Sequence, residues 1–127
     1  MQPHAPTGLG QLHVSTDDLD ASIHFYTEVL GLPLLFRVPG QPMAFVQAGA
    51  TRLYLGTPES EAFRSHTVMY LWVDDVFESY AAIRDRGATF VGEPHVVHRT
   101  ATELWMAFTA DPDGNHVAIM QERPITD

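Results

Sequence analysis

The 127-residue chain contains no cysteine. This absence excludes a disulfide framework, a thiolate nucleophile and a zinc site built on thiolates. Basic residues are also scarce, because seven Lys and Arg stand against sixteen Asp and Glu and give a formal net charge of −9. A surface of this charge repels phosphate backbones and the sequence has no basic stripe, so we expect no nucleic-acid partner.

Long apolar runs and several signature motifs are missing as well. No stretch approaches the roughly 18 apolar residues of a membrane span, and the opening MQPHAPTGLGQ lacks the basic and apolar regions of a secretory signal. We therefore expect a cytoplasmic protein with no membrane partner. The sequence has no glycine-rich phosphate loop and no GxSxG elbow, so phosphate binding and serine-based catalysis have no support.

The most informative feature that is present is a repeat. The segment HVSTDDLDASIHFYTEVLG (13–31) is matched by YLWVDDVFESYAAIRDRG (70–87), which starts 70 − 13 = 57 positions later. Both copies read as a strand, an Asp-Asp helix start, an amphipathic helix and a glycine stop. Segments with strand patterns follow each copy, at 34–38, 43–48 and 51–55 and again at 89–97, 103–109 and 115–121.

This pattern predicts a single domain of the α+β class, built from two tandem βαβββ modules. We place the first module at about residues 9–56, a polar connector at 57–66 and the second module at about 67–122 of the chain. We expect the modules to form a curved mixed sheet around a cleft, with the helices outside. The reason is that an open face of Trp and Tyr side chains would be unfavourable in water.

Strand alternation predicts which side chains point away from the helices and into this cleft. The expected ligand-binding set combines imidazole, hydroxyl, charged and aromatic groups: His13, Ser15, Arg52, Tyr54, Tyr70, Trp72, Glu103, Trp105 and His116. The rings offer stacking faces, and the Arg52 guanidinium is suited to clamping a carboxylate.

The paired modules, the histidine-bearing first strand and the DPDGN turn at 111–115 resemble the vicinal oxygen chelate superfamily. That family groups glyoxalase I, extradiol dioxygenases, fosfomycin-resistance enzymes and bleomycin-binding proteins. The resemblance covers roughly residues 9–122 and implies the fold just described. Because the family often builds its cleft across an interface, it also implies a homodimer.

The family's enzymes typically place metal ligands at four positions, which the resemblance carries onto His13, Tyr54, Tyr70 and Ala118. Of these, only the histidine is a good ligand. A tyrosine must first lose a proton of pKa about 10, and alanine cannot coordinate. His95 and His98 could also chelate, but three residues apart on a regular strand they would point to opposite faces.

Two functions remain open at this point. The first is a metal-independent binding protein without a cofactor, similar to the bleomycin-resistance branch, that sequesters a small aromatic or cationic molecule and so confers antibiotic resistance. The second is a glyoxalase-like lyase or isomerase, or a dioxygenase, with a non-standard divalent site (Zn, Ni, Mn or Fe) around His13 and His116, helped by Glu103. A metal-free enzyme with His13 as general base is a weaker third hypothesis.

Overall fold

The computed structural model describes residues 2–126. It contains two successive βαβββ units, as the repeat predicts. Their elements are β1 (Gln11–Ser15), α1 (Leu19–His24), a π-helical turn η1 (Phe25–Val29), β2 (Leu34–Arg37), β3 (Met43–Ala48) and β4 (Thr51–Gly56), then a 3-10 turn η2 (Glu61–Phe63), β5 (Val68–Trp72), α2 (Val76–Asp85), β6 (Phe90–Arg99), β7 (Thr102–Ala110) and β8 (His116–Pro124). No helix in this described range is long and apolar enough to cross a membrane.

Both helices begin at the predicted acidic cap. The Asp18 carboxylate accepts a hydrogen bond of 3.1 Å from the Ala21 amide, and the Asp75 carboxylate accepts bonds of 3.0 and 3.1 Å from the amides of Phe77 and Glu78. The glycine after each helix, Gly31 or Gly87, adopts a positive φ. The repeated Asp-Asp and glycine signals therefore mark the helix boundaries correctly.

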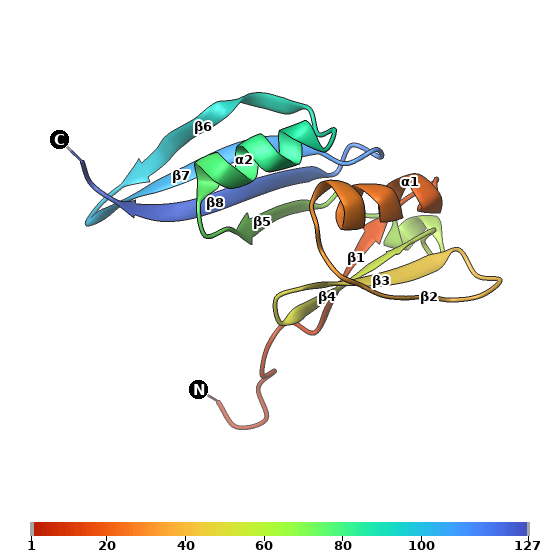
Figure 1. The fold of residues 1–127 in the computed structure, drawn as a ribbon. Coiled ribbons are helices and arrows are strands. Elements are labelled where there is room, and N and C mark those ends of the chain that lie inside the picture. The colour runs from red at the N-terminus through yellow and green to blue at the C-terminus, as the bar shows by residue number, and fades with distance from the viewer. Residues whose placement is uncertain (1, 127) are drawn as a thin grey trace.

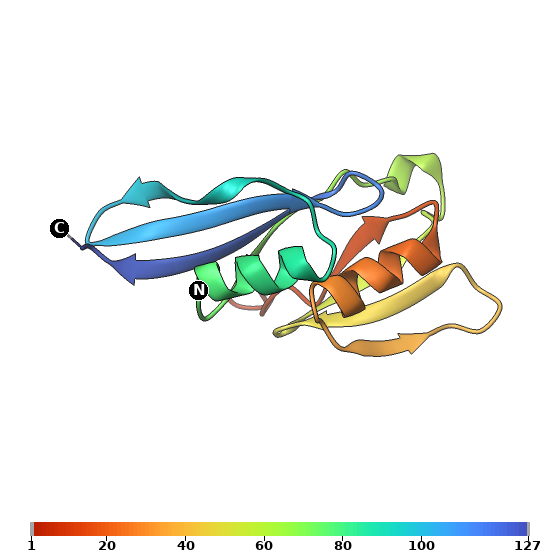
Figure 2. The same ribbon diagram turned by 45° about the horizontal axis from the view of Figure 1, so that its top comes forward.

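The expected mixed sheet is present as two four-stranded sheets (Figure 1). Sheet A has the order β1-β4-β3-β2 and sheet B the order β5-β8-β7-β6. In each, the first strand of the module runs parallel to the last, and the other pairs are antiparallel. In both views the helices lie next to each other, and the sheets extend from them in different directions (Figures 1 and 2).

One apolar core joins the two modules. Its members include Val14 and Leu55 from sheet A and Val76 and Ile119 from the second module, all at most 1% exposed. Arg86, at the end of α2, adds a polar link, because its Nε donates a 2.9 Å hydrogen bond to the Val29 carbonyl at the end of the first helix. Much of the helix-covered face of each sheet is thus packed in the interior, and the opposite faces are open.

A buried carboxylate reinforces this junction. Asp111, the first residue of the DPDGN turn, is only 5% exposed. Its Oδ2 accepts hydrogen bonds from the Tyr26 hydroxyl at 2.7 Å and the Asn115 Nδ2 at 2.8 Å, and its Oδ1 accepts two more from the amides of Asp113 and Asn115. Because Tyr26 belongs to the first module and the turn to the second, the carboxylate ties the modules together.

Replacing Tyr26 by Phe should destabilise the protein. The change removes one donor from a buried carboxylate while keeping the ring, and hydrogen bonds to charged groups contribute about 1.5–3 kcal/mol. Urea denaturation measures this loss in the free energy of unfolding. The matched control is Tyr70→Phe, whose ring is 50% exposed and whose substitution should change stability by less than about 0.5 kcal/mol. Equal stability of the two variants would contradict the role given to Asp111.

Candidate functional site

An aromatic row crosses all four strands of sheet A on the face opposite α1, which we call its non-helix face. It consists of His13, Tyr54, Phe45 and Phe36, which occupy neighbouring register positions on β1, β4, β3 and β2. The ring centroids lie 4.6, 5.3 and 4.8 Å apart in that order. Sequence reasoning found His13 and Tyr54 but missed the two phenylalanines, although the alternation of Phe45 with buried Ala44 and Val46 was a usable signal.

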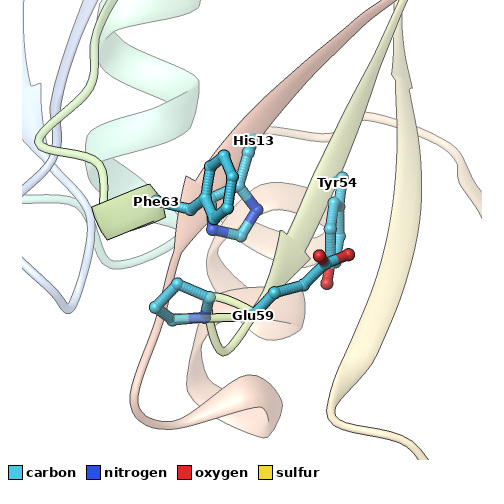
Figure 3. A pocket seen from close by; sticks show the side chains of 5 residues that line it. His13, Tyr54, Glu59 and Phe63 are labelled. Carbon is cyan, nitrogen blue, oxygen red and sulfur yellow. The ribbon is translucent and has the colours of Figure 1, made fainter. Parts of the chain in front are cut away.

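A cavity of about 200 Å³ opens at one end of this aromatic row, lined by His13, Tyr54, Pro58, Glu59 and Phe63. Figure 3 shows these side chains converging from β1, β4 and the connector. The connector residues were not among the predicted site residues. Only the unusual placement of a phenylalanine in the polar stretch GTPESEAFRSH (56–66) hinted at a role.

The cavity favours an uncharged imidazole beside a carboxylate. His13 Nε2 shares a 2.9 Å hydrogen bond with the Ser15 hydroxyl, and its Nδ1 is buried without a hydrogen-bond partner among the described residues. Burial lowers the pKa of His13, and the negative charge of Glu59 only partly opposes this. At neutral pH the cavity therefore carries the negative charge of Glu59 and a neutral His13.

Two other predicted residues of sheet A have evident structural partners. The Ser15 hydroxyl accepts a 2.8 Å hydrogen bond from the Ser65 amide and is buried, so it anchors the connector to β1. Arg52 lies on the non-helix face, where its Nε donates to Gln11 Oε1 at 2.8 Å and its guanidinium sits 4.8 Å from the Phe45 ring centre. Arg52 is exposed and remains able to contact a ligand that lies along the aromatic row.

The predicted residues Tyr70, Trp72 and His116 lie on the non-helix face of sheet B, and none of them lines the cavity beside His13. Tyr70 is paired in register with Ala118, and His116 with Val68. Tyr70 and Trp72 line a groove of about 220 Å³ together with residues of the first module, Leu32, Ala48 and Gly49, and with Leu71 of β5. The structure therefore brings His13 and Tyr54 together, and separately Tyr70 and Trp72, rather than placing all of them around one cavity.

Trp105 and Glu103 are not on the predicted face. The Trp105 ring packs against Phe77 of α2 with centroids 5.1 Å apart, and Glu103 lies two residues away on the same face of β7. The expectation that these two side chains line the cleft is wrong. Its cause is that β7 carries apolar residues on both faces, so alternation alone does not identify the face that the helix covers.

The strand that carries His95 and His98 is also irregular. Bulges in β6 shift its register against β7, so that His95 lies opposite Met106 and His98 opposite Leu104. Since Met106 and Leu104 are two residues apart on one strand, both histidines are brought to the same face. The expectation of opposite faces holds only for a regular strand and is wrong here.

Proteins named as lactoylglutathione lyases or probable lactoylglutathione lyases resemble this chain over most of its length. A probable lactoylglutathione lyase of Synechocystis sp. is 30% identical over 121 residues, covering 85% of this chain and 90% of the relative. The lactoylglutathione lyase of Escherichia coli O157:H7 is 31% identical over 119 residues, covering 84% and 86%. That of Haemophilus influenzae is 28% identical over 123 residues, covering 84% and 86%.

These relatives correct the expectation that the protein has no cofactor. Lactoylglutathione lyases are metal-dependent enzymes, so the relationship favours a divalent metal such as Zn or Ni. The expected absence of a cofactor is therefore wrong.

The side chains of the single chain do not by themselves form such a site. Within residues 2–126, no group of three or more His, Asp or Glu side chains is arranged to hold a metal ion. The four positions carried over from the family fall on two sheets, with His13 and Tyr54 on sheet A and Tyr70 and Ala118 on sheet B. Of these, His13 is the one ligand of the usual kind.

Solved structures and a family model define the relationship further. A lactoylglutathione lyase from Agrobacterium tumefaciens superposes with a TM-score of 0.71 at 25% identity, covering 91% of this chain and 94% of that one. TnmS3, an antibiotic binding protein from Streptomyces sp. CB03234, shares the fold with a TM-score of 0.73 at 24% identity, covering 95% and 98%. The family model matches residues 8–119. The chain therefore belongs to the Glyoxalase/Bleomycin resistance protein/Dioxygenase superfamily.

Proposed function

We propose that the protein binds and sequesters a small aromatic or cationic molecule on the non-helix face of sheet A. The observation that carries this proposal is the aromatic row of His13, Tyr54, Phe45 and Phe36, which ends at a cavity whose wall includes the Glu59 carboxylate. Ring faces spaced in this way accept a planar ligand by stacking, and a carboxylate beside them favours positive charge. The net charge of −9 attracts a cationic ligand from a distance.

A binding role is one that this fold performs elsewhere, since TnmS3 is described as an antibiotic binding protein. The same role here would confer antibiotic resistance if the bound molecule were a drug. The aromatic row supports this role without requiring a reaction at the bound molecule, because stacking and charge attraction need only a fixed surface.

We further propose that a second copy of the chain completes the site. The cavity of about 200 Å³ is smaller than the roughly 300–1,000 Å³ of typical ligand pockets. Large apolar side chains on other strands are left open: Leu34, Leu35 and Phe36 on β2 are 45–47% exposed, and Val68, Tyr70 and Trp72 on β5 are 50–65% exposed. Exposed apolar patches of this kind mark interaction sites, and a homodimer would cover them while adding wall to the cavity.

Ligand binding can be tested with two fluorescent probes, ethidium as an aromatic cation and anilinonaphthalene sulfonate as an aromatic anion. We expect saturable ethidium binding at about 0.15 M salt, where distant surface charges are screened. Tyr54→Ala should weaken it about tenfold, because a lost ring contact of about 1.4 kcal/mol is one decade in Kd. Glu59→Gln should weaken ethidium binding and leave the anion unaffected.

The control for this titration is Val91→Ala, which trims a 79% exposed apolar side chain on β6 that lines neither hollow and should not change ethidium binding. Glu59 is exposed and lies in the connector, so its substitution tests the proposal even if Tyr54→Ala folds poorly. Unchanged affinity in both Tyr54→Ala and Glu59→Gln would contradict a ligand on the aromatic row.

Dimer formation can be tested by sedimentation. Trp72 is 65% exposed, and placing a carboxylate there by Trp72→Glu should convert a dimer to monomers, because a buried unpaired charge is strongly unfavourable. Phe77→Gln, a change at an exposed ring on the helix side, should leave the dimer intact. A wild-type protein that sediments as a monomer at micromolar concentration would remove the proposed second copy from the site.

The His13 imidazole should titrate below its ordinary pKa of 6.5, because burial disfavours its charged form. The unfolded chain then binds the proton first, so stability falls as the pH drops from about 6.5 through the lower folded value, and this effect is absent above pH 6.5. Glu59→Gln should move the midpoint lower still, since the carboxylate raises the pKa of His13. NMR titration, assigned with His13→Gln, measures the midpoint; a value at or above 6.5 would contradict this account.

A second candidate is the lyase activity for which the relatives are named, supported by 28–31% identity over most of their length. An assay of the lactoylglutathione lyase reaction, run in the direction of lactoylglutathione formation as well as cleavage on protein loaded with Zn or Ni, separates the two functions. Turnover that His13→Ala abolishes would replace the sequestering role by an enzymatic one, whereas saturable binding without turnover supports sequestration.

A further inference from the structure

A hollow lies on the helix side of sheet B, beside the start of α2. It has a volume of about 490 Å³ and is lined by Phe77, Glu103, Trp105, Arg123, Pro124 and Thr126. The hollow exists because α2 has 10 residues, about 15 Å, whereas β7 and β8 have nine residues each, about 30 Å. The helix therefore covers only part of the sheet, and the strands extend beyond it (Figure 1).

Aromatic rings form one wall of this hollow. Phe77 and Trp105 contact each other with centroids 5.1 Å apart, yet Phe77 is still 43% exposed. An exposed phenylalanine on the second position of a helix, backed by a tryptophan, is a surface that an apolar group of a ligand can cover.

The Glu103 side chain is largely withdrawn from water. Its side chain is 12% exposed, and its ion-pair partner, Arg99 Nε, lies 3.8 Å away while Arg99 itself is 54% exposed. A carboxylate withdrawn from water in this way is unfavourable unless donors reach it, and an ammonium group in the hollow would supply them.

Arg123 of β8 is paired in register with Glu103 of β7. Its Nη1 donates to Gln121 Oε1 at 2.9 Å and lies 3.9 Å from Asp75, and its centre is 5.0 Å from the Phe77 ring centre. A guanidinium carries five N–H donors, so this fixed group retains donors for a ligand carboxylate. Opposite residues of an antiparallel pair have Cα atoms about 5 Å apart, so the Glu103 and Arg123 side chains start next to each other on one face of the sheet.

We propose that this hollow is a second binding site for a small zwitterion with an apolar body, of the amino-acid class. The ligand's ammonium group pairs with Glu103, its carboxylate pairs with Arg123, and its apolar side chain covers Phe77 and Trp105. The site is separate from the aromatic row, since its residues lie on the helix side of sheet B, and it does not depend on the function proposed for sheet A.

The two tryptophans of the chain make a selective test available. Trp72→Phe leaves Trp105 as the sole tryptophan reporter of the hollow, and Trp105→Phe leaves Trp72 as the reporter of the opposite face. The probes are L-phenylalanine, phenethylamine, which lacks the carboxylate, and 3-phenylpropanoate, which lacks the ammonium group. We expect L-phenylalanine to change Trp105 emission saturably and to bind at least about tenfold more tightly than either truncated probe, since each charged contact contributes about one decade.

Glu103→Gln and Arg123→Gln, each in the Trp72→Phe background, should weaken L-phenylalanine binding about tenfold. The matched control is Glu122→Gln, which removes a carboxylate next in sequence to Arg123 but opposite Leu104, on the other face; binding should not change. Thermal melting of each variant confirms that it is folded. Because two variants are tested independently, the proposal remains testable if one of them fails to fold. No saturable change of Trp105 emission with any probe, or equal affinity in Glu103→Gln, Arg123→Gln and the control, would overturn the proposal. So would a response confined to Trp72.

Discussion

The carboxylate of Asp111 receives four hydrogen bonds in an almost dry position between the modules, and the geometry of the site follows from it. Asn115, held against that carboxylate, donates to the Ser15 carbonyl at 3.3 Å and accepts from the Thr67 amide at 2.9 Å. It thereby fixes the end of β1 against the start of β5. Burial and the Asp111 charge raise the pKa of Tyr26, so its phenol remains a hydrogen-bond donor throughout the physiological range.

The position of His13 depends on this junction. Ser15 shares a hydrogen bond with the imidazole and binds Ser65 of the connector, which in turn carries Glu59 and Phe63 over the cavity. A polar junction between the modules thus sets both the face of the aromatic row and the segment that walls its open end. Loosening the DPDGN turn would therefore disturb the cavity without any change in the residues that line it, because buried hydrogen-bond networks act as units.

The fold was largely predictable because its signals are local. Acidic caps, glycine stops and the alternation in Met43–Ala48 act within a few residues, and the structure has them where the sequence indicates. The division into two sheets was not predictable, because the relative placement of the modules depends on long-range contacts such as Tyr26 with Asp111 and Arg86 with Val29. Repeats specify units, and packing between units specifies their arrangement.

The candidate site was predictable only where one face of a strand is clearly apolar. Tyr54 alternates with buried Leu53 and Leu55, and its placement follows. Trp105 lies in a strand with apolar residues on both faces, and the sequence offers no criterion to choose between them. Glu59 reaches the cavity from a connector without periodicity, so only the folded chain reveals it.

The duplication explains why each module has a different hollow. With the shift of 57 positions, Phe77 corresponds to Asp20 (77 − 57 = 20), which forms an ion pair with Arg37 of β2 in the first module. At the matching place the second module has a phenylalanine packed against Trp105 beside an open hollow.

On the other face, His13 corresponds to Tyr70 (70 − 57 = 13), and of these two residues the histidine lies in a cavity with a carboxylate. Both helices start with an aspartate cap, because the first backbone N–H groups of a helix need hydrogen-bond acceptors. Residues on the sheet faces have no such requirement and can differ between the modules. The same βαβββ unit therefore provides an aromatic row on one face of the first module and a charged hollow on the opposite face of the second.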